Sequence, residues 1–362
     1  MPTNADVLNF ATQKLIPKWT EQFYEYHPVL DKIVLKGNIE RSKQGGPYIE
    51  FPIVTNGPGA VTRIETGSEV YSSTRRTIGQ RGRVYAPRMV YSFVIPGKDL
   101  AEAQGETAIA RLIKVYPEAA LMEFHEYIVG QFVNGNGSTN NVQGFVTLNG
   151  DATYDTGSGL TETGVMDYAT YGSQTGTVFN INKATTSLWN NQYQAVSSFA
   201  TDGRSKMRRA YWDASLQGKQ GGPVDIMLGD IVSYNNYYDD LDDQVRYQVK
   251  QPDGEKGRAV RQGLMFQDAE FYVEPELDTN LSAFTTSAVA SGNGLVYMLK
   301  SDTWHLYTMG EDSGMETKGD FSFRGPVKVP GQDAWEWEIV LSMQAYCDRL
   351  NANGVVVGTA IS

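Results

Sequence analysis

Histidine is the side chain most often used in metal and catalytic sites, and this chain has only three, His27, His125 and His305. None falls in the HxxxH or HExxH spacing of a zinc site, so we expect structural roles for all three. The sequence has no Walker loop, no GxGxxG after a strand and no GxSxG elbow. We therefore predict that the chain is not an enzyme, and we assign no catalytic residue, cofactor site or metal ligand. A glycosidase-type carboxylate pair stays open, because the 42 Asp and Glu residues supply many candidate pairs.

An acidic run formed by Asp239, Asp240, Asp242 and Asp243 could attract a cation. The run lacks the spacing and the glycine of a calcium loop, which favours the solvated end of a helix. The single cysteine, Cys347, excludes an internal disulfide and a cysteine-rich metal site. We expect Cys347 to be a small buried hydrophobic residue.

A basic cluster follows in the N-terminal third, where five arginines fall within 14 residues: Arg75, Arg76, Arg81, Arg83 and Arg88. They could be solvated or salt-bridged surface, contacts to acidic neighbours, or contacts to nucleic-acid phosphates. Residues 1–100 hold 13 Lys and Arg against 9 Asp and Glu, which is +4, so the other 262 residues must carry −15 to reach the net charge of −11. This asymmetry suits a basic N-terminal part that lies on acidic surfaces of neighbouring copies. A chain this acidic should bind DNA only weakly and without sequence preference.

The composition is that of a globular protein, with 41% hydrophobic and 20% charged residues. A chain of 362 residues can hold two or three domains. No window offers 18 apolar residues, and the N-terminus lacks a basic-then-apolar signal region, so nothing indicates a membrane or secretion. We expect the chain to stay in the cytoplasm where it is made.

A long amphipathic helix over residues 104–133 is the element that must position the others. Apolar residues recur there at three- and four-residue steps, namely Ile109, Leu112, Ile113, Tyr116, Ala120, Phe124, Tyr127, Ile128 and Phe132. About 30 residues at 1.5 Å each give a rod roughly 45 Å long. Pro117 removes one backbone hydrogen bond, which predicts a kink or a split into two pieces in line.

A projecting hairpin is predicted before this helix. Residues 48–55 alternate as a strand, Asn56-Gly57 is a strong turn signal, and residues 60–65 form the return strand. Pro52 confines the first strand to an edge. A two-stranded ribbon is marginal in water, so we expect this one to rest on another part of an assembly. The residues predicted to contact other subunits are Phe51, Ile53, Arg75, Arg76, Arg81 and Arg83.

The remaining elements mix helices and strands without a repeated unit, which indicates the α+β class. Residues 1–37 are predicted to be an arm with a short amphipathic helix, and residues 135–177 an exposed loop. Further helices are expected at 187–199, at 202–212 and from an Asp230 cap to about 244. Strands are expected at 84–95, 223–228, 263–272, 295–299, 303–308, 335–345 and 354–361.

The order of these elements resembles the major capsid protein family of tailed bacteriophages, which has the Hong Kong 97-like capsid fold. Similar segments are VDIML at 224–228, FQDAEFYVEPEL at 266–277, VYMLKSDTWHL at 296–306 and NANGVVVG at 351–358. The resemblance covers nearly the whole chain. It implies an N-terminal arm at 1–37, an extended E-loop hairpin at 38–83, a peripheral domain at 84–145 with its spine helix at about 104–133, an insertion loop at 146–186, an axial domain at 187–307, and return strands of the peripheral domain with a C-terminal strand at 308–362.

The resemblance implies a structural protein that self-assembles into the icosahedral shell around the double-stranded DNA genome of a tailed phage. Its partners would be copies of itself in pentamers and hexamers, with portal, scaffold and decoration proteins as further candidates. It would contact packaged DNA weakly and non-specifically, would contact no membrane, and would assemble in the host cytoplasm into the virion capsid.

Some members of the family join a lysine of the E-loop to an asparagine of another subunit, and Lys43 with Asn351 or Asn353 are the candidates here. Two alternatives to the capsid function remain. One is a β-rich enzyme or carbohydrate-binding domain, which the 21 tyrosines could suggest. The other is an encapsulin-like compartment shell of the same fold.

Overall fold

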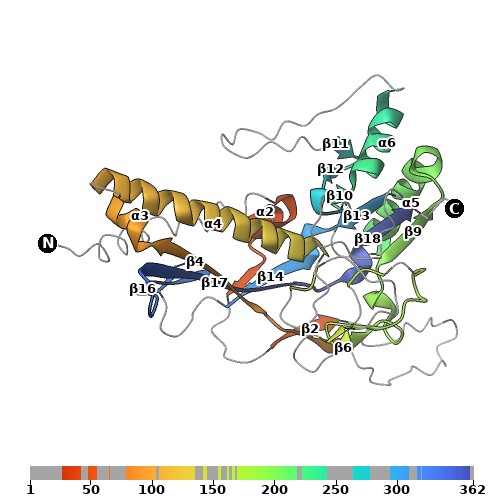
Figure 1. Cartoon of the computed structure of the whole chain (residues 1–362). Coiled ribbons are helices and arrows are strands. Elements are labelled where there is room, and N and C mark those ends of the chain that lie inside the picture. The colour runs from red at the N-terminus through yellow and green to blue at the C-terminus, as the bar shows by residue number, and fades with distance from the viewer. Residues whose placement is uncertain are drawn as a thin grey trace.

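The computed structural model describes residues 27–41, 48–54, 65, 79–102, 106–134, 142–144, 154–155, 161–162, 165–167, 169–217, 222–242, 264–277, 294–309, 316–318 and 320–358. These residues form two mixed β-sheets, each with helices on one face, and three short two-stranded ribbons (Figure 1). The chain is therefore α+β, as expected. Most of the predicted arm, together with Lys43, Arg75 and Arg76, lies outside the described residues.

The first sheet is built around β17 (Ala334–Cys347), a strand of 14 residues. Strand β4 (Arg88–Pro96) pairs antiparallel with one side of β17, and β16 (Phe321–Lys328) pairs with the other. The end of β17 pairs with β14 (Trp304–Thr308), which pairs parallel with β1 (Ile39–Arg41). Strand β15 (Glu316–Lys318) adds to β16. The first sheet thus joins segments from both ends of the chain.

Helix α4 (Glu106–Asn134) packs on one face of this sheet and follows the short helix α3 (Gly97–Glu102) (Figure 1). It is one continuous helix of 29 residues, so the predicted split at Pro117 does not occur. A proline removes one backbone hydrogen bond, and the packing of Phe124, Ile128 and Phe132 holds the later turns in place. The predicted apolar stripe is wrong at Tyr116 and Tyr127, which are 36% and 41% exposed.

The second sheet has the order β11 (Leu264–Phe266), β12 (Ala269–Val273), β10 (Ile226–Gly229), β13 (Leu295–Leu299), β18 (Gly354–Gly358) and β9 (Gln192–Val196). Helices α5 (Arg204–Gln217) and α6 (Ile231–Asp242) cover one face of this sheet. Their buried side chains form a second hydrophobic core with the strands beneath them. Asp230 caps α6 as predicted, because its Oδ1 accepts a hydrogen bond of 2.9 Å from the Ser233 backbone N–H. The predicted strand at 263–272 is instead the hairpin β11–β12, with Gln267 at a positive φ of 54° in its turn.

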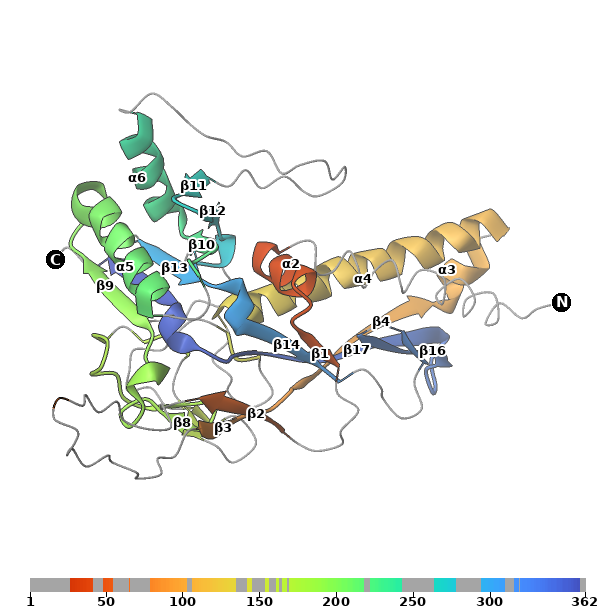
Figure 2. The ribbon, with the colours of Figure 1, turned by 180° about the vertical axis from the view of Figure 1, so that it is seen from behind.

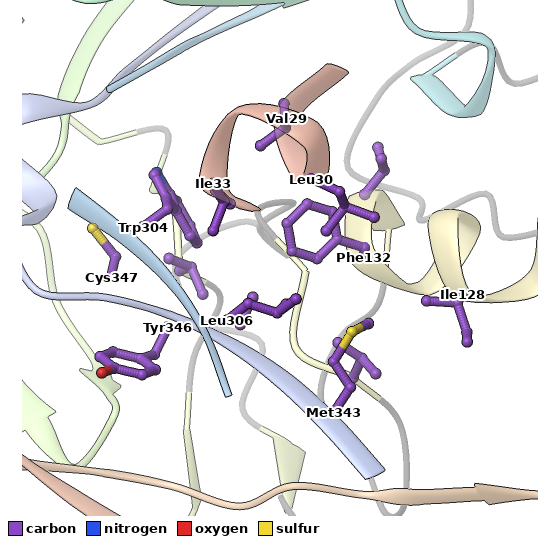
Figure 3. Close-up of a cluster of buried hydrophobic side chains, with 14 of the residues drawn as sticks. Val29, Leu30, Ile33, Ile128, Phe132, Trp304, Leu306, Met343, Tyr346 and Cys347 are labelled. Carbon is purple, nitrogen blue, oxygen red and sulfur yellow. The ribbon is translucent and has the colours of Figure 1, made fainter. Parts of the chain in front are cut away.

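Helix α2 (Pro28–Leu35) lies where the two sheets meet (Figure 2). Its buried residues Val29, Leu30 and Ile33 belong to the same core as residues of α4, β14 and β17. Figure 3 shows this cluster, with Phe132 and Ile128 from α4, Trp304 and Leu306 from β14, and Met343, Tyr346 and Cys347 from β17. One continuous core therefore joins the first sheet, α2 and α4.

The predicted hairpin pairs differently from expectation. Strand β2 (Ile49–Val54) pairs antiparallel with β3 (Gly79–Val84), with Val54 opposite Gly79. Of the predicted return strand at 60–65 only Glu65 is described, and the paired strand lies farther along the chain. Residues 39–41, placed in the E-loop by the resemblance, are a strand of the first sheet instead.

Two further segments correct the sequence-based predictions. The segment from residue 165 to 186 is not an exposed insertion, because Val165, Met166 and Phe179 are fully buried. It contains the small ribbon β7 (Thr177–Val178) and β8 (Ile181–Asn182), and ahead of it lies a second ribbon, β5 (Tyr154–Asp155) with β6 (Thr161–Glu162).

Residues 187–199 are not a helix. They form a 3₁₀ turn (Ser187–Trp189) and strand β9, which pairs with the C-terminal strand β18. Short 3₁₀ segments also occur at Pro275–Leu277, Ser301–Thr303 and Leu350–Ala352, and a π-helical turn at Phe199–Gly203 leads into α5. Among the described helices, none combines the length and the apolar character needed to cross a membrane.

Candidate assembly surfaces

The β2–β3 ribbon is anchored by an aromatic cluster at its base. The Phe51 ring stacks on Tyr346 of β17 at a centroid distance of 4.2 Å and meets the edge of Phe179 at 6.0 Å. Gly82 on the opposite strand leaves room for that ring, since a Cβ there would lie 2.5 Å from Phe51 Cζ. The Arg83 backbone N–H donates to the Phe179 carbonyl at 3.0 Å and ties the ribbon to the β7–β8 turn. The base of the ribbon is therefore part of the subunit.

This burial corrects two predicted contact residues. Phe51 and Ile53 are only 6% and 5% exposed in the single chain, so their side chains have little surface left for another subunit. The alternation along β2 predicts a projecting face, but it points Phe51 and Ile53 into the subunit's own core.

The arginines of the basic cluster are only partly described. Arg81 and Arg83 form ion pairs with Glu50 across the ribbon at 3.2 and 2.9 Å, and the Arg83 guanidinium lies 4.9 Å from the centre of the Tyr48 ring. Of the three alternatives given for the arginine cluster, salt-bridged surface is therefore correct for Arg81 and Arg83 within the single chain. The Arg81 side chain is still 80% exposed. Arg75 and Arg76 lie outside the described residues.

A group of ion pairs, here called the α2 clamp, joins α2 to the second sheet. Lys36 Nζ lies 2.9 Å from Asp225 Oδ2 and 2.7 Å from Asp302 Oδ1. Lys32 Nζ lies 2.9 Å from Glu270 Oε2, and the buried His27 Nε2 lies 2.8 Å from Glu274 Oε2. Because α2 packs its apolar face on α4 and β14, the clamp fixes how the first sheet meets the second.

Asp225 is the centre of this clamp. It accepts hydrogen bonds from the Ser301 hydroxyl and from the Ser301 backbone N–H, the latter at 2.8 Å. Burial opposes its ionisation, but the Ser301 hydrogen bonds and the Lys36 ammonium outweigh burial and hold the pKa of Asp225 below its ordinary value of 3.8.

We expect Asp225→Asn to weaken the acid sensitivity of the fold. Because the pKa of Asp225 is lower in the folded than in the unfolded chain, its stabilisation is present above pH 3.8 and is lost as the pH falls through the folded pKa. Urea unfolding of the subunit between about pH 5 and pH 2 should show a shallower loss of stability in Asp225→Asn than in the wild type. The control is Asp239→Asn, on the exposed end of α6, which should keep the wild-type slope. Equal slopes for all three proteins would show that Asp225 does not contribute to the acid sensitivity of the fold.

The solvent side of α4 carries an exposed apolar stripe. Val115 and Met122 are 60% and 69% exposed, and the exposed Ala119 lies between them at helical spacing. The face of the first sheet opposite α4 adds the exposed residues Val90, Val94 and Val327, since Val94 and Val327 both lie opposite Glu336 of β17. Groups of exposed apolar side chains like these two are typical of protein interaction sites.

No catalytic centre emerges from the described residues. Across the described part of the chain, no three His, Cys, Asp or Glu side chains are grouped as metal ligands. His27 pairs with Glu274, and the His305 ring stacks on Tyr346 at 5.1 Å, so both have structural contacts.

Cys347 is buried, and burial raises the pKa of its thiol. Asp240 of the acidic run forms an ion pair with Arg204 at 3.1 Å.

Among the described residues, Lys183 has a lowered pKa of the kind that catalytic lysines have. Burial lowers the pKa of its ammonium to about 8, and the charge of Asp167 partly opposes that shift. Its Nζ donates to the Val165 carbonyl at 3.0 Å, and the side chain is only 1% exposed. Lys183 therefore fastens the 165–183 segment and has no access to a substrate from solvent.

The asparagines considered for a covalent cross-link are buried in the single chain. The Asn353 Oδ1 accepts hydrogen bonds from the Lys300 backbone N–H and from Trp304 Nε1, at 2.9 and 3.0 Å. Its Nδ2 donates to the Arg349 carbonyl at 3.0 Å. Asn353 thus serves as a structural link between β13, β14 and the C-terminal segment, and the cross-link with Lys43 stays a prediction.

Comparisons with known proteins place this fold. No protein-family model and no curated relative matches the sequence. Among solved structures, the capsid asymmetric unit of cyanophage A-1(L) matches with a TM-score of 0.58 and 12% identity, over 90% of this chain and 92% of that one. The capsid of an empty GTA particle matches with a TM-score of 0.52 and 9% identity, over 91% and 90%. The SrpI encapsulin of Synechococcus elongatus matches with a TM-score of 0.50 and 8% identity, over 92% and 88%. The chain therefore has the fold that these capsid and encapsulin subunits share.

Proposed function

We propose that this chain is a major capsid protein that self-assembles into the icosahedral shell around the double-stranded DNA genome of a tailed bacteriophage. The observation that carries the proposal is a backbone like that of a phage capsid subunit over about nine-tenths of both chains. The exposed apolar stripe on α4 and the exposed valines of the first sheet support it, because an assembly would cover them.

Each region has a role in this proposal. The segment 55–78 is the E-loop that lies over an adjacent subunit, and the β2–β3 ribbon holds its ends. The first sheet with its spine helix α4 is the peripheral domain. The second sheet with α5 and α6 is the axial domain, which meets its copies in pentamers and hexamers. Arg75 and Arg76 contact acidic surfaces of neighbouring copies, as do Arg81 and Arg83 beside their ion pairs with Glu50 of the same chain. Each exposed pair contributes about 0.2 to 1 kcal/mol.

The shell needs no catalysis from this chain. Portal, scaffold and decoration proteins are its candidate partners, and assembly takes place in the host cytoplasm. The net charge of −11 disfavours tight DNA binding, so packaged DNA contacts the shell weakly and non-specifically.

An encapsulin-like compartment shell is the second candidate, because an encapsulin subunit matches the fold at a TM-score of 0.50. The two functions differ in what the shell encloses. Nuclease-protected DNA inside particles from producing cells supports the capsid function. Particles that enclose protein and no DNA support the compartment function.

Sedimentation velocity of the purified chain tests the proposed function. The chain has a mass of 40.0 kDa, and a shell of many copies sediments at megadalton mass. We expect a boundary of closed particles that grows at the expense of free subunits as the protein concentration rises. An enzyme or a carbohydrate-binding domain would remain a monomer or a small oligomer at every concentration.

A further inference from the structure

The exposed apolar stripe on α4 is the open part of a longer line along that helix. Val115, Met122 and Val129 follow one another at seven-residue steps, close to two full turns, so they lie on one side of the helix. Val115 and Met122 are 60% and 69% exposed, whereas Val129 is only 6% exposed. Val133, about one turn farther on, is fully buried. The line is therefore covered at the C-terminal end of α4 and open at Val115 and Met122.

Helix α2 lies at the covered end of this line. Val129 and Val133 belong to the same core cluster as the buried residues of α2. The chain enters α2 at His27, whose ring meets the Phe132 ring of α4 edge-on at a centroid distance of 6.0 Å. Figures 1 and 2 both show α2 beside the C-terminal half of α4. The segment that precedes α2, residues 1–26, is therefore joined to the subunit where the covered part of the line ends.

Residues 1–26 have side chains that fit the open part of the line. Leu8, Ala11, Leu15 and Trp19 recur at three- and four-residue steps, which is typical of the apolar side of a helix. Such a side is marginal in water unless it packs on another apolar surface. The segment and the open part of α4 thus each have an apolar side that lacks a cover.

The charges along the line are also complementary. Glu126 lies between Met122 and Val129 on the same side of α4 and is exposed. In the part of the chain that the structure describes, no ion pair involves Glu126. Lys14 and Lys18 are four residues apart in the N-terminal segment, so on a helix they would share a face and could approach this carboxylate.

The length of the segment matches the distance that it would have to span. Val115 is 17 residues from Phe132, which is about 26 Å along the axis of an α-helix. A flexible chain of 26 residues has an end-to-end distance of about 25 to 30 Å. A tether of this kind gives the segment an effective concentration on the order of millimolar at its own α4. The α4 helix of another copy at micromolar concentration would compete poorly.

We infer that residues 1–26 of the free subunit fold back on α4 of the same copy and cover the line at Val115 and Met122. The apolar side from Leu8 to Trp19 packs on these two residues, so the cover that begins with α2 continues along the helix. The occupant of the stripe in the free subunit is thus the chain's own N-terminal segment. Assembly then displaces the segment before a neighbouring copy covers the stripe, and this last step alone rests on the proposed function.

Oxidation of Met122 by hydrogen peroxide tests the cover at concentrations where the chain is a free subunit. A covered methionine sulfur is oxidised more slowly than an exposed one. We expect deletion of residues 1–26 to make Met122 oxidation severalfold faster, as measured by peptide mass spectrometry. The rate at Met265, which is partly exposed on β11 of the second sheet, should not change. The melting temperature of each variant shows that it folds.

Two point variants separate the apolar contact from the change in length and charge. Leu15→Asp and Gln13→Asp alter the net charge equally, but two positions along a helix place these side chains on different sides. Leu15→Asp should expose Met122 to oxidation as the deletion does, and Gln13→Asp should behave like the full chain. Equal Met122 rates in the full chain, the deletion variant and Leu15→Asp would overturn the inference.

Cross-linking decides whether the segment covers its own copy. Ala11→Cys is combined with Ala119→Cys, since Ala119 is exposed between Val115 and Met122, and a short bismaleimide is added to a mixture of ¹⁴N and ¹⁵N subunits. The native Cys347 is buried, so the two added thiols react. We expect linked peptides in which both halves carry the same isotope.

The control replaces Ala119→Cys by Val90→Cys, on the face of the first sheet opposite α4, and should give no link. Linked peptides of mixed isotope, or equal yields from the two pairs, would overturn the inference. All of these measurements use free subunits, so such results would leave the proposed function standing. A wild-type chain that never assembles would contradict the proposed function and leave the cover on α4 intact.

Discussion

Replacing residues 55–78 by Asn-Gly should leave a folded subunit that no longer forms closed particles. Val54 and Gly79 are opposite each other at the end of the ribbon, so a two-residue turn can join them without changing the register. The aromatic anchor at Phe51 and the strand β1 stay in place, and we expect the melting temperature of the subunit to change little. Particles should be lost because the segment that is proposed to lie over the adjacent subunit is gone.

The control for this excision keeps the length and removes the side chains. A Gly-Ser segment of the same length, 24 residues, can still span the gap between copies. The assembly of this variant therefore shows whether the length of the segment is sufficient without its side chains. Electron microscopy of each variant gives the particle count and diameter. Full-size shells from the Asn-Gly variant would show that residues 55–78 do not clamp neighbouring subunits.

Phe51→Ala should lower the free energy of unfolding of the isolated subunit by about 3 kcal/mol, the lower end of the range for a buried aromatic residue. The ring is 6% exposed and packs between Tyr346, Phe179 and the backbone at Gly82, so truncation leaves a cavity that the paired strands cannot easily fill. Urea unfolding of dissociated subunits, followed by tryptophan fluorescence, measures the change.

Val90→Ala is the matched control, because Val90 is a strand residue that is 52% exposed, and its truncation should change the stability by no more than about 0.5 kcal/mol. If Phe51→Ala unfolds like the wild type while its assembly fails, the ring acts between subunits after all. That outcome would restore the role that the sequence alone suggested.

Elements whose signals are local could be predicted from the sequence. The 104–133 helix differs from α4 by one or two residues at each end, because its apolar spacing persists over many turns. The tyrosine positions in that helix were wrong, since periodicity gives the apolar side of a helix but does not show how far the neighbouring sheet extends. The strand β17 was recovered for the same reason, through the alternation of Trp337, Ile339 and Leu341.

Elements that depend on distant partners could not be predicted. Residues 187–199 fit a helix or a strand equally well as a short apolar run, and only pairing with β18 decides between them. The ribbon partner of β2 lies 25 residues beyond Val54, because Val54 is opposite Gly79, and a nearer Asn-Gly turn gave the stronger local signal. Phe51 and Ile53 alternate in the same way whether their face meets another subunit or the subunit's own core.

The α2 clamp was missed for a related reason. Lys36 and Asp225 are 189 positions apart, and no spacing rule connects them. One signal was present: Asp225 is a carboxylate inside the apolar run VDIML, where a charge needs a partner.

Electron microscopy of the purified wild-type chain at high concentration tests the central claim most directly. The account predicts closed, hollow, icosahedral particles whose subunits have the two-sheet fold described above, with segment 55–78 of each copy lying on a neighbour. A monodisperse 40.0 kDa monomer with no particles at any concentration would contradict it.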